Sequence, residues 1–278
     1  MREIVPPEAF GIVAQPLTFW ERAWNSGVVR KTALLIVLAL AWELYARHLA
    51  NPLLVPTFSA TLEALWEGVS KGGLLGRAAF SVRVLLMGYS AGIFLAAMLT
   101  AFAVSTRVGT DLLETLTSMF NPLPAIALLP LALLWFGLGY PSLMFVMVHS
   151  VLWPVALNTH SGFTAVSKTL RMVGQNCGLS GVRYVLQILI PAAFPSILTG
   201  LKIGWAFAWR TLIAAELVFG VSSGQGGLGW FIYENKNLLE VPSVFAGLFS
   251  VIVIGLIVEN LVFRNIELRT VRRWGMQG

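Results

Sequence analysis

The sequence carries very little charge. Of its 278 residues only 12% are charged and 57% are hydrophobic, whereas a soluble domain carries about 25% charged residues. Asp111 is the only aspartate, and residues 115–167 contain no Asp, Glu, Lys or Arg at all. About 20 apolar residues are enough to cross the hydrocarbon core of a bilayer, so this uncharged stretch is long enough for two spans and a hairpin. The composition predicts an integral membrane protein.

Further absences exclude several kinds of chemistry. Cys177 is the only cysteine, so no internal disulfide is possible, and no Gly-Lys dipeptide occurs, which excludes a phosphate-binding P-loop. No His-x-x-x-His pair and no cysteine cluster is present, so we expect no metal site. We interpret His149 and His160 as packing or hydrogen-bonding residues. The chain shows no means of hydrolysing ATP, so uphill transport needs a partner or an ion gradient.

The basic excess does not indicate nucleic-acid binding. The net charge is +6, but no basic run with interleaved aromatics is present. Basic residues next to membrane helices are expected on the cytoplasmic side. The N-terminus lacks a basic-then-apolar signal pattern. We therefore predict a cytoplasmic N-terminal segment over residues 1–31 and a single transmembrane domain over residues 32–278.

Hydropathy predicts an all-α membrane protein with about six spans. Each predicted span is a long apolar run with few charges. The expected spans cover residues 32–49, 80–104, 119–136, 141–160, 193–219 and 243–263. Gly-x-x-x-Gly pairs at 88 and 92 and at 200 and 204 indicate close helix packing.

The distribution of Lys and Arg favours an orientation with both termini in the cytoplasm. Most Lys and Arg residues then lie in cytoplasmic connections. The connection over residues 50–79 has apolar residues at 58, 62, 65 and 66, which predicts a helix lying on the membrane. The glycine-rich run SSGQGGLG at 222–229 is expected to be an extracytoplasmic turn. Lys202 is expected to extend toward the cytoplasmic surface.

A polar stretch, CGLSGVRYVLQILIP at 177–191, interrupts the apolar sequence on the cytoplasmic side. Gly178 permits a sharp turn. After it, apolar residues recur at helical spacing as far as Leu189, and Pro191 and Pro195 are expected to end this short helix. The shape suits a helix that another protein grips, and it equally suits an ordinary interfacial linker.

The spacing from Gly178 to Ile188 and Pro191 resembles the Gly-x9-Ile-x-Leu-Pro core of the EAA loop in permease subunits of binding-protein-dependent ABC importers. Here Met172-Val173-Gly174 stands in place of Glu-Ala-Ala, and Ile190 replaces Leu. The resemblance implies a coupling loop at about 165–191 that a cytoplasmic ATPase binds. It assigns ATPase coupling to Gly178, Leu179, Ser180, Val182, Arg183 and Pro191.

Three further segments resemble the nitrate, taurine and alkanesulfonate branch of that family. They are LVPTFSATLEAL at 54–65, NPLPAIALLPLALLWFGLG at 121–139 and PAAFPSILTGLKIGWAFAWRTLIAAEL at 191–217. The resemblance implies the type I importer permease fold in a bacterial inner membrane. It also implies a second permease subunit forming a homodimer, two ATPase subunits that bind ATP and Mg, and an extracytoplasmic binding protein. It implies no cofactor and no catalytic residue in this chain.

Two charged residues in the fifth expected span are candidates for the translocation pathway. A charge near the bilayer centre costs roughly 2.5–3.5 kcal/mol, so such residues usually face protein or a wet cavity. Arg210 is interpreted either as a site for an anionic substrate or as the partner of an acid, Glu259 or the Glu216 of a second subunit. Glu216, Trp205 and Trp209 complete the candidate pathway set, with lining and packing both open for the two tryptophans.

Two other classes remain as alternatives. A secondary transporter driven by an ion gradient would work without an ATPase, and we would expect more intramembrane acids or an inverted repeat. An integral-membrane enzyme or scaffold would need a cluster of His or acidic residues near one membrane face, and the sequence shows none. The exact anion is not fixed by the sequence, because selection in the resembled family rests largely with the binding protein.

Overall fold

A computed structural model describes residues 25–219 and 226–275 of the chain. Residues 1–24 of the predicted N-terminal segment and residues 222–225 of the predicted turn lie outside these described residues. The described end of the turn already includes the start of a helix at Leu228. Every regular element in the described part is helical, which confirms the all-α prediction. The chain divides into two compact units, residues 1–59 and 60–278, which are described separately below.

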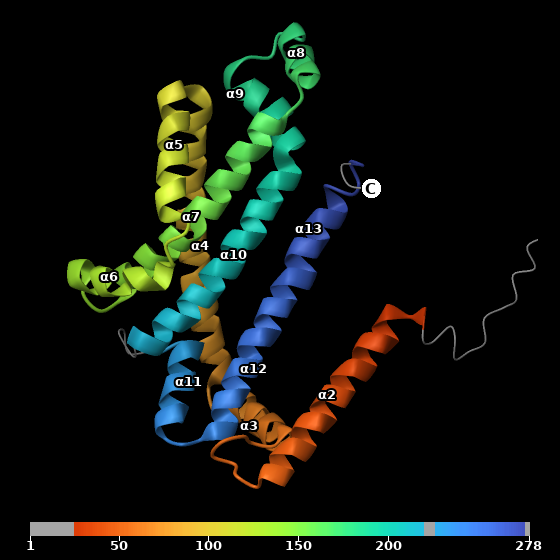
Figure 1. The fold of residues 1–278 in the computed structure, drawn as a ribbon, viewed down its shortest axis with the longest axis vertical. Coiled ribbons are helices and arrows are strands. Elements are labelled where there is room, and N and C mark those ends of the chain that lie inside the picture. The colour runs from red at the N-terminus through yellow and green to blue at the C-terminus, as the bar shows by residue number, and fades with distance from the viewer. Residues whose placement is uncertain (1–24, 220–225, 276–278) are drawn as a thin grey trace, which may run out of the picture. The chain divides into compact units, whose positions relative to one another are not determined.

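Most of the apolar helices extend beyond the ends of the expected spans, whereas the third expected span is divided between shorter elements (Figure 1). The first unit contains α2 (Gly27–Leu49) and the start of α3 (Phe58–Ser70). The remaining elements belong to the second unit. They are α4 (Leu74–Ser105), α5 (Arg107–Phe120), η2 (Ala125–Leu128), α6 (Leu129–Phe136), α7 (Tyr140–Ala165), α8 (Lys168–Asn176), α9 (Gly181–Tyr184), η3 (Val185–Leu189), α10 (Ile190–Phe219), α11 (Leu228–Asn237), α12 (Val241–Ile257), η4 (Val258–Phe263) and α13 (Arg264–Arg269).

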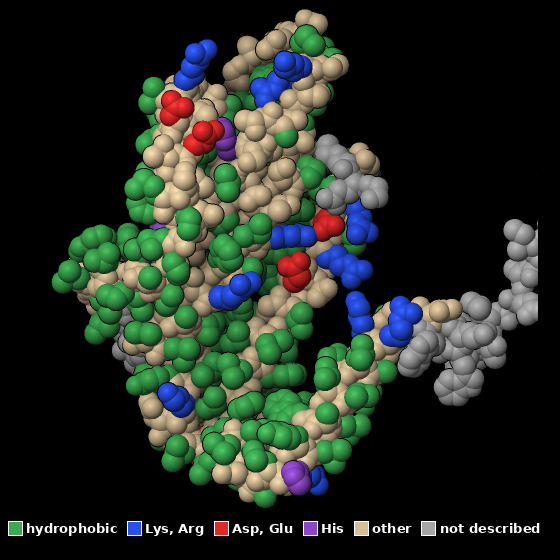
Figure 2. Space-filling model, viewed as in Figure 1, with side chains coloured by type: hydrophobic (Ala, Val, Ile, Leu, Met, Phe, Trp, Pro, Cys, Tyr) green, Lys and Arg blue, Asp and Glu red, His purple; other side chains and the backbone are tan. Residues whose placement is uncertain are grey.

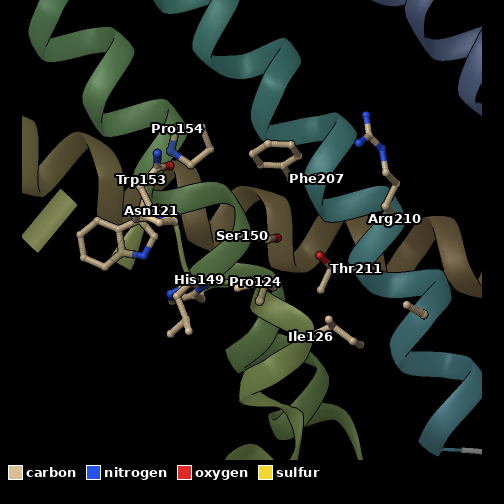
Figure 3. A pocket seen from close by; sticks show the side chains of 14 residues that line it. Asn121, Pro124, Ile126, His149, Ser150, Trp153, Pro154, Phe207, Arg210 and Thr211 are labelled. Atoms are coloured by element: carbon tan, nitrogen blue, oxygen red, sulfur yellow. The ribbon is translucent and has the colours of Figure 1, made fainter. Parts of the chain in front are cut away.

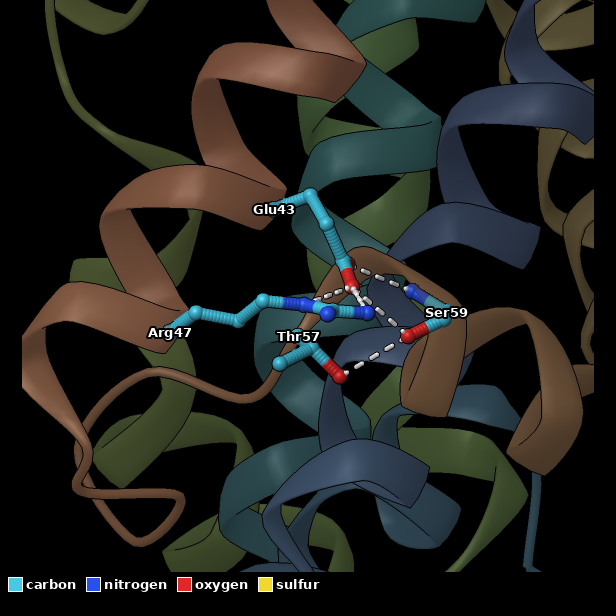
Figure 4. A network of polar contacts seen from close by, with 4 residues as sticks. All are labelled: Glu43, Arg47, Thr57 and Ser59. Atoms are coloured by element: carbon cyan, nitrogen blue, oxygen red, sulfur yellow. Dashed lines mark hydrogen bonds and ion pairs between the residues drawn. The ribbon is translucent and has the colours of Figure 1, made fainter.

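In the first unit the chain folds back against α2 after its left-handed end at Ala50. The Trp42 indole donates a hydrogen bond of 2.9 Å to the Pro56 carbonyl. Glu43 forms an ion pair of 2.7 Å with Arg47 and accepts hydrogen bonds from the Ser59 amide and hydroxyl, each 3.0 Å (Figure 4). These contacts fix the turn that leads into α3. The helix expected within residues 50–79 is present as Phe58–Ser70, and its position on the membrane stays a prediction.

The centre of the second unit is α7, which packs against both α4 and α10. Glycines make the approach possible. A Cβ atom at Gly92 of α4 would lie 2.6 Å from the Val151 Cβ atom of α7. A Cβ atom at Gly200 of α10 would lie 2.8 Å from the Asn158 Cβ atom of α7. The glycine pairs therefore act as the packing devices that their spacing predicts.

The third expected span, 119–136, does not form one continuous helix. The chain ends α5 at Phe120, turns through Asn121–Pro124 and continues as η2 and α6, with an angle of 87° between the two halves. Pro122 and Pro124 lack the amide donors that would continue α5. The result is a broken span or a re-entrant segment.

The count of six spans is not confirmed. Four described helical stretches are long and apolar enough to cross a membrane: Leu74–Ser105, Tyr140–Ala165, Gly181–Val218 and Val241–Arg269. The bent pair raises the number to five if it forms one span. Helix α2 covers the first expected span, but it is not among these four candidate membrane spans. Figure 2 shows hydrophobic side chains over much of the visible face, as expected for a multi-pass membrane protein.

The helix that follows the polar stretch also differs from expectation. We predicted that Pro191 and Pro195 end a short helix, but Gly181–Val218 runs as one continuous helix. A π-helical turn, η3, precedes Pro191, and the Ile190 amide bonds the Val185 carbonyl. The wider turn accommodates the first proline, while Pro195 lies inside α10. The separate short helix of the loop is α8, which precedes Gly178.

Candidate functional site

The turn between α5 and η2 forms one wall of a cavity of about 390 Å³ in the second unit. The opposite walls come from α7 and α10 (Figure 3). Asn121–Ile126, Pro154, Phe207 and Ala214 provide a mostly apolar lining. The polar lining side chains are those of Asn121, His149, Ser150, Arg210 and Thr211, together with the indole N–H of Trp153.

Arg210 is the one sequence-predicted pathway residue that lines this cavity. Its guanidinium carbon lies 5.8 Å from the centre of the Phe207 ring, one helical turn away on α10. Among the described residues it forms no ion pair, so the expected pairing with Glu259 is absent there. The cavity therefore presents a cation and no carboxylate among its lining residues.

Two aromatic side chains of α7 bring buried polar atoms to the cavity. The Trp153 ring stacks on Phe120 with centroids 5.4 Å apart, and the His149 ring lies 6.0 Å from Trp153. The indole nitrogen of Trp153 and both ring nitrogens of His149 are buried and have no hydrogen-bond partner among the described residues. A buried polar group without a partner is costly, so these atoms favour an occupant that can bond to them.

Glu216 lies away from the cavity lining and holds the start of α11. Its carboxylate accepts hydrogen bonds from the Ser81 hydroxyl at 2.8 and 2.9 Å and from the Gly229 amide at 2.8 Å. The Ser81 oxygen in turn accepts a 2.9 Å bond from the Leu228 amide. Glu216 therefore joins α4, α10 and α11 in the described structure, and its role in a pathway stays a prediction.

The two tryptophans of α10 are buried in packing within the chain. Trp205 makes an edge contact with Tyr89 at 5.4 Å, and the Tyr89 hydroxyl donates to the Leu201 carbonyl at 2.8 Å. Trp209 donates to the Val251 carbonyl at 3.3 Å. These contacts join α10 to α4 and α12. Neither tryptophan is among the residues that line the cavity, and a pathway role for them stays a prediction.

The predicted coupling residues gather at a tight turn between α8 and α9. Gly178 has φ +75°, a left-handed conformation that glycine adopts without strain. Its amide bonds the Gln175 carbonyl at 2.9 Å, and the Leu179 amide bonds the Gly174 carbonyl at 3.0 Å. The other predicted residues follow along the turn and the start of the long helix, where Ser180, Val182 and Arg183 are exposed and Leu179 and Pro191 are partly buried.

α8 is fixed to its neighbours on both sides. The Arg171 guanidinium donates to the carbonyls of Phe163 and Val166, at 2.5 and 3.2 Å, and so binds the end of α7. A Cβ atom at Gly174 would lie 2.9 Å from the Ile188 side chain and 3.0 Å from the Tyr184 ring. The glycine that replaces an alanine of the EAA pattern therefore permits close packing of α8 against α9 and η3.

Sequence reasoning missed most of the cavity. Arg210 was found because a charge in an apolar span is conspicuous. Trp153, Phe207 and Thr211 gave no signal, because aromatic and hydroxyl residues are common in membrane helices. His149 is conspicuous as a lone histidine, but its place in the same cavity lining as Arg210 depends on the packing of α7 against α10.

The long apolar helices and the broken third segment define a multi-pass membrane protein. Residues 88–270 match the family described as binding-protein-dependent transport system inner membrane component. The chain belongs to this family. Its members are transport subunits rather than enzymes, and they work with ATPase and substrate-binding partners.

Several named relatives align with this chain over most of their length. The taurine transport system permease protein TauC of Escherichia coli is 28% identical, over 81% of this chain and 82% of TauC. The nitrate import permease protein NrtB of Synechocystis sp. is 29% identical, over 89% and 90% of the two chains. The bicarbonate transport system permease protein CmpB of Synechococcus elongatus is 26% identical, over 85% and 87%. The chain therefore falls in the branch that its motifs resemble.

Proposed function

We propose that this chain is the membrane-spanning subunit of an ABC importer for a small anion of the sulfonate, taurine or nitrate class, coupled to a separate ATPase through the loop around Gly178. The family match over residues 88–270 carries the proposal, because it includes both this loop and the cavity. Relatives named for taurine, nitrate and bicarbonate transport support an anionic substrate.

The loop offers a surface that an ATPase can bind. Met172 and Val173 of α8, with Val182 and Leu186 beyond the turn, expose at least half of their side chains. Apolar exposure at this turn, beside the positive charges of Lys168 and Arg183, suits a protein partner. With both termini in the cytoplasm, as the Lys and Arg distribution favours, α8 and the turn lie on the ATPase side.

The partners follow from this assignment. Two ATPase subunits bind ATP and Mg, so this chain needs no cofactor of its own. A second copy of the chain completes the pore as a homodimer, and an extracytoplasmic binding protein delivers the anion. ATPase closure moves α8 and the continuous helix Gly181–Val218 together, because Gly174 packs directly on Tyr184 and Ile188. Arg210 then attracts the anion within the membrane.

Co-purification tests the coupling. We would express the chain with the ATPase and the binding protein encoded with it, solubilise it in mild detergent and measure complex formation and ATP hydrolysis. Gly178→Val should weaken the complex and reduce uptake at least about tenfold, because a β-branched residue does not tolerate positive φ. Gly178→Asn is the matched control, since asparagine tolerates this conformation, and it should retain most activity.

The same experiment can also contradict the coupling assignment. A wild-type chain that never binds an ATPase, yet transports an anion when no ATPase is present, contradicts the coupling assignment. It would instead support a transporter driven by an ion gradient, which the family match does not favour.

A further inference from the structure

The cavity beside the α5–η2 turn combines features that suit one kind of ligand. It is bounded by Arg210 on α10 and by Trp153 and His149 on α7, with Ser150 and Thr211 also in its lining (Figure 3). Its lining includes donors and a cation but no Asp or Glu side chain. This set of groups favours an anion, because the positive charge attracts it and the donors can form hydrogen bonds with it.

The buried donor of Trp153 points to a ligand independently of Arg210. Trp153 is only 8% exposed, and its indole nitrogen has no acceptor among the described residues. An indole N–H can only donate, so an acceptor in the cavity would satisfy it. His149 adds two more buried nitrogens without partners, one of which donates in the neutral ring. These groups lie in the lining of the same cavity as Arg210.

The size and the walls of the cavity indicate more than an inorganic anion. Its volume of about 390 Å³ is within the range of small-molecule sites, roughly 300–1,000 Å³. A nitrate-sized ion occupies on the order of one or two water volumes of about 30 Å³ each, and would leave most of this space empty. The Phe207 ring and the three prolines at 122, 124 and 154 supply flat apolar surfaces that an organic body can cover.

We propose that this cavity is a binding site within the permease chain itself for an organic sulfonate or carboxylate with an apolar body. The acidic group binds Arg210 and Thr211, and the body packs against Phe207 and the proline-rich turn. The Trp153 N–H donates to an oxygen or other acceptor of the ligand. This assignment rests on the proposed transport function and narrows the substrate class of the transporter. The permease chain itself selects organic anions, and the binding protein makes a separate selection.

The site can be tested without the ATPase or the binding protein. We would place the purified full-length chain in lipid nanodiscs and measure binding of benzenesulfonate, taurine and nitrate by isothermal titration calorimetry. Benzenesulfonate should bind at least about tenfold more tightly than nitrate, because it fills the apolar walls as well as meeting the cation. Benzyl alcohol, which is aromatic but uncharged, should bind at least about tenfold more weakly than benzenesulfonate.

Matched variants separate the site from nonspecific partition. Arg210→Gln should weaken benzenesulfonate binding about tenfold or more, and Trp153→Phe, which keeps a ring and removes the N–H, about fivefold. Arg210→Lys should recover part of the loss. Arg83→Gln is the control, because Arg83 is also an exposed arginine in a long apolar helix and does not line the cavity. It should bind as the wild type does.

The outcomes distinguish this proposal from the proposed function. If nitrate binds as tightly as benzenesulfonate, or if Arg210→Gln and Arg83→Gln behave alike while both elute as the wild type on size exclusion, the site assignment is wrong. An absence of binding of all three anions to the wild type also overturns it. Neither result affects co-purification with the ATPase, so the transport assignment stands or fails separately.

Discussion

At the scale of single residues, two charged side chains on α10 have different environments. Arg210 is exposed, lines the cavity and forms no ion pair within the described chain, whereas Glu216 is only 3% exposed and accepts hydrogen bonds from two groups, the Ser81 hydroxyl and the Gly229 amide. A buried acid that is fully bonded stabilises a particular arrangement of helices. Glu216 thus orders the start of α11, and Arg210 remains available to a ligand.

Ser81→Ala tests the arrangement around Glu216. The change removes the hydroxyl that bonds both carboxylate oxygens and leaves the Leu228 amide without its acceptor. We expect a loss of about 1–3 kcal/mol in the free energy of unfolding, measured by thermal unfolding in detergent. Ser90→Ala, at an exposed position on the same helix, should change stability by less than about 0.5 kcal/mol. Equal melting temperatures for both variants would show that the carboxylate contributes little.

At the scale of elements, α7 is held between α4 and α10 at glycine contacts. Gly92→Val should disrupt this packing, because its Cβ atom would lie 2.6 Å from the Val151 Cβ atom and 2.8 Å from its Cγ1 atom. Overpacking of this kind costs about 1–3 kcal/mol or more, which thermal unfolding in detergent would report. Gly76→Val is the matched control on the same helix, since nothing lies within 4 Å of its added Cβ atom. Comparable destabilisation of the two variants would contradict the packing argument.

The attachment of α8 to α7 gives a second prediction for an element. Arg171→Ala removes the two bonds to the carbonyls of Phe163 and Val166. Hydrogen bonds to a charged group contribute about 1.5–3 kcal/mol each, so amide hydrogen exchange in α8 should accelerate at least about tenfold. Lys168→Ala, exposed at the start of α8, should leave the exchange rates near those of the wild type. Unchanged exchange in the Arg171 variant would mean that packing at Gly174 alone holds the helix.

The sequence was sufficient for most elements and insufficient for their breaks. Hydropathy located α4, α7, α10 and α12 because each is an apolar run of spanning length. Hydropathy did not give the 87° bend at Asn121–Pro124, although prolines there break the helical hydrogen-bond ladder, and it did not give the π-turn that keeps the helix continuous at Pro191. Pro191 follows a π-helical turn, whereas Pro122 and Pro124 follow the end of α5. Hydropathy does not report such differences in the backbone hydrogen bonds. The cavity was not predictable for the same reason, since it is formed at the bend.

At the scale of the whole molecule, one exposed cysteine can report the orientation of the chain. Cys177 is the only cysteine and lies beside Gly178 in the proposed coupling turn. A membrane-impermeant maleimide should label it in inside-out vesicles and leave it unlabelled in intact spheroplasts, because positive residues favour a cytoplasmic loop. Leu238→Cys in a Cys177→Ser background is the matched control, since Leu238 is exposed at the end of α11 and should label from the opposite side. Bound ATPase should slow labelling of Cys177 at least about fivefold by covering the turn, and leave residue 238 unaffected. Labelling of Cys177 from outside would reverse the orientation, and it would remove the turn from the ATPase side.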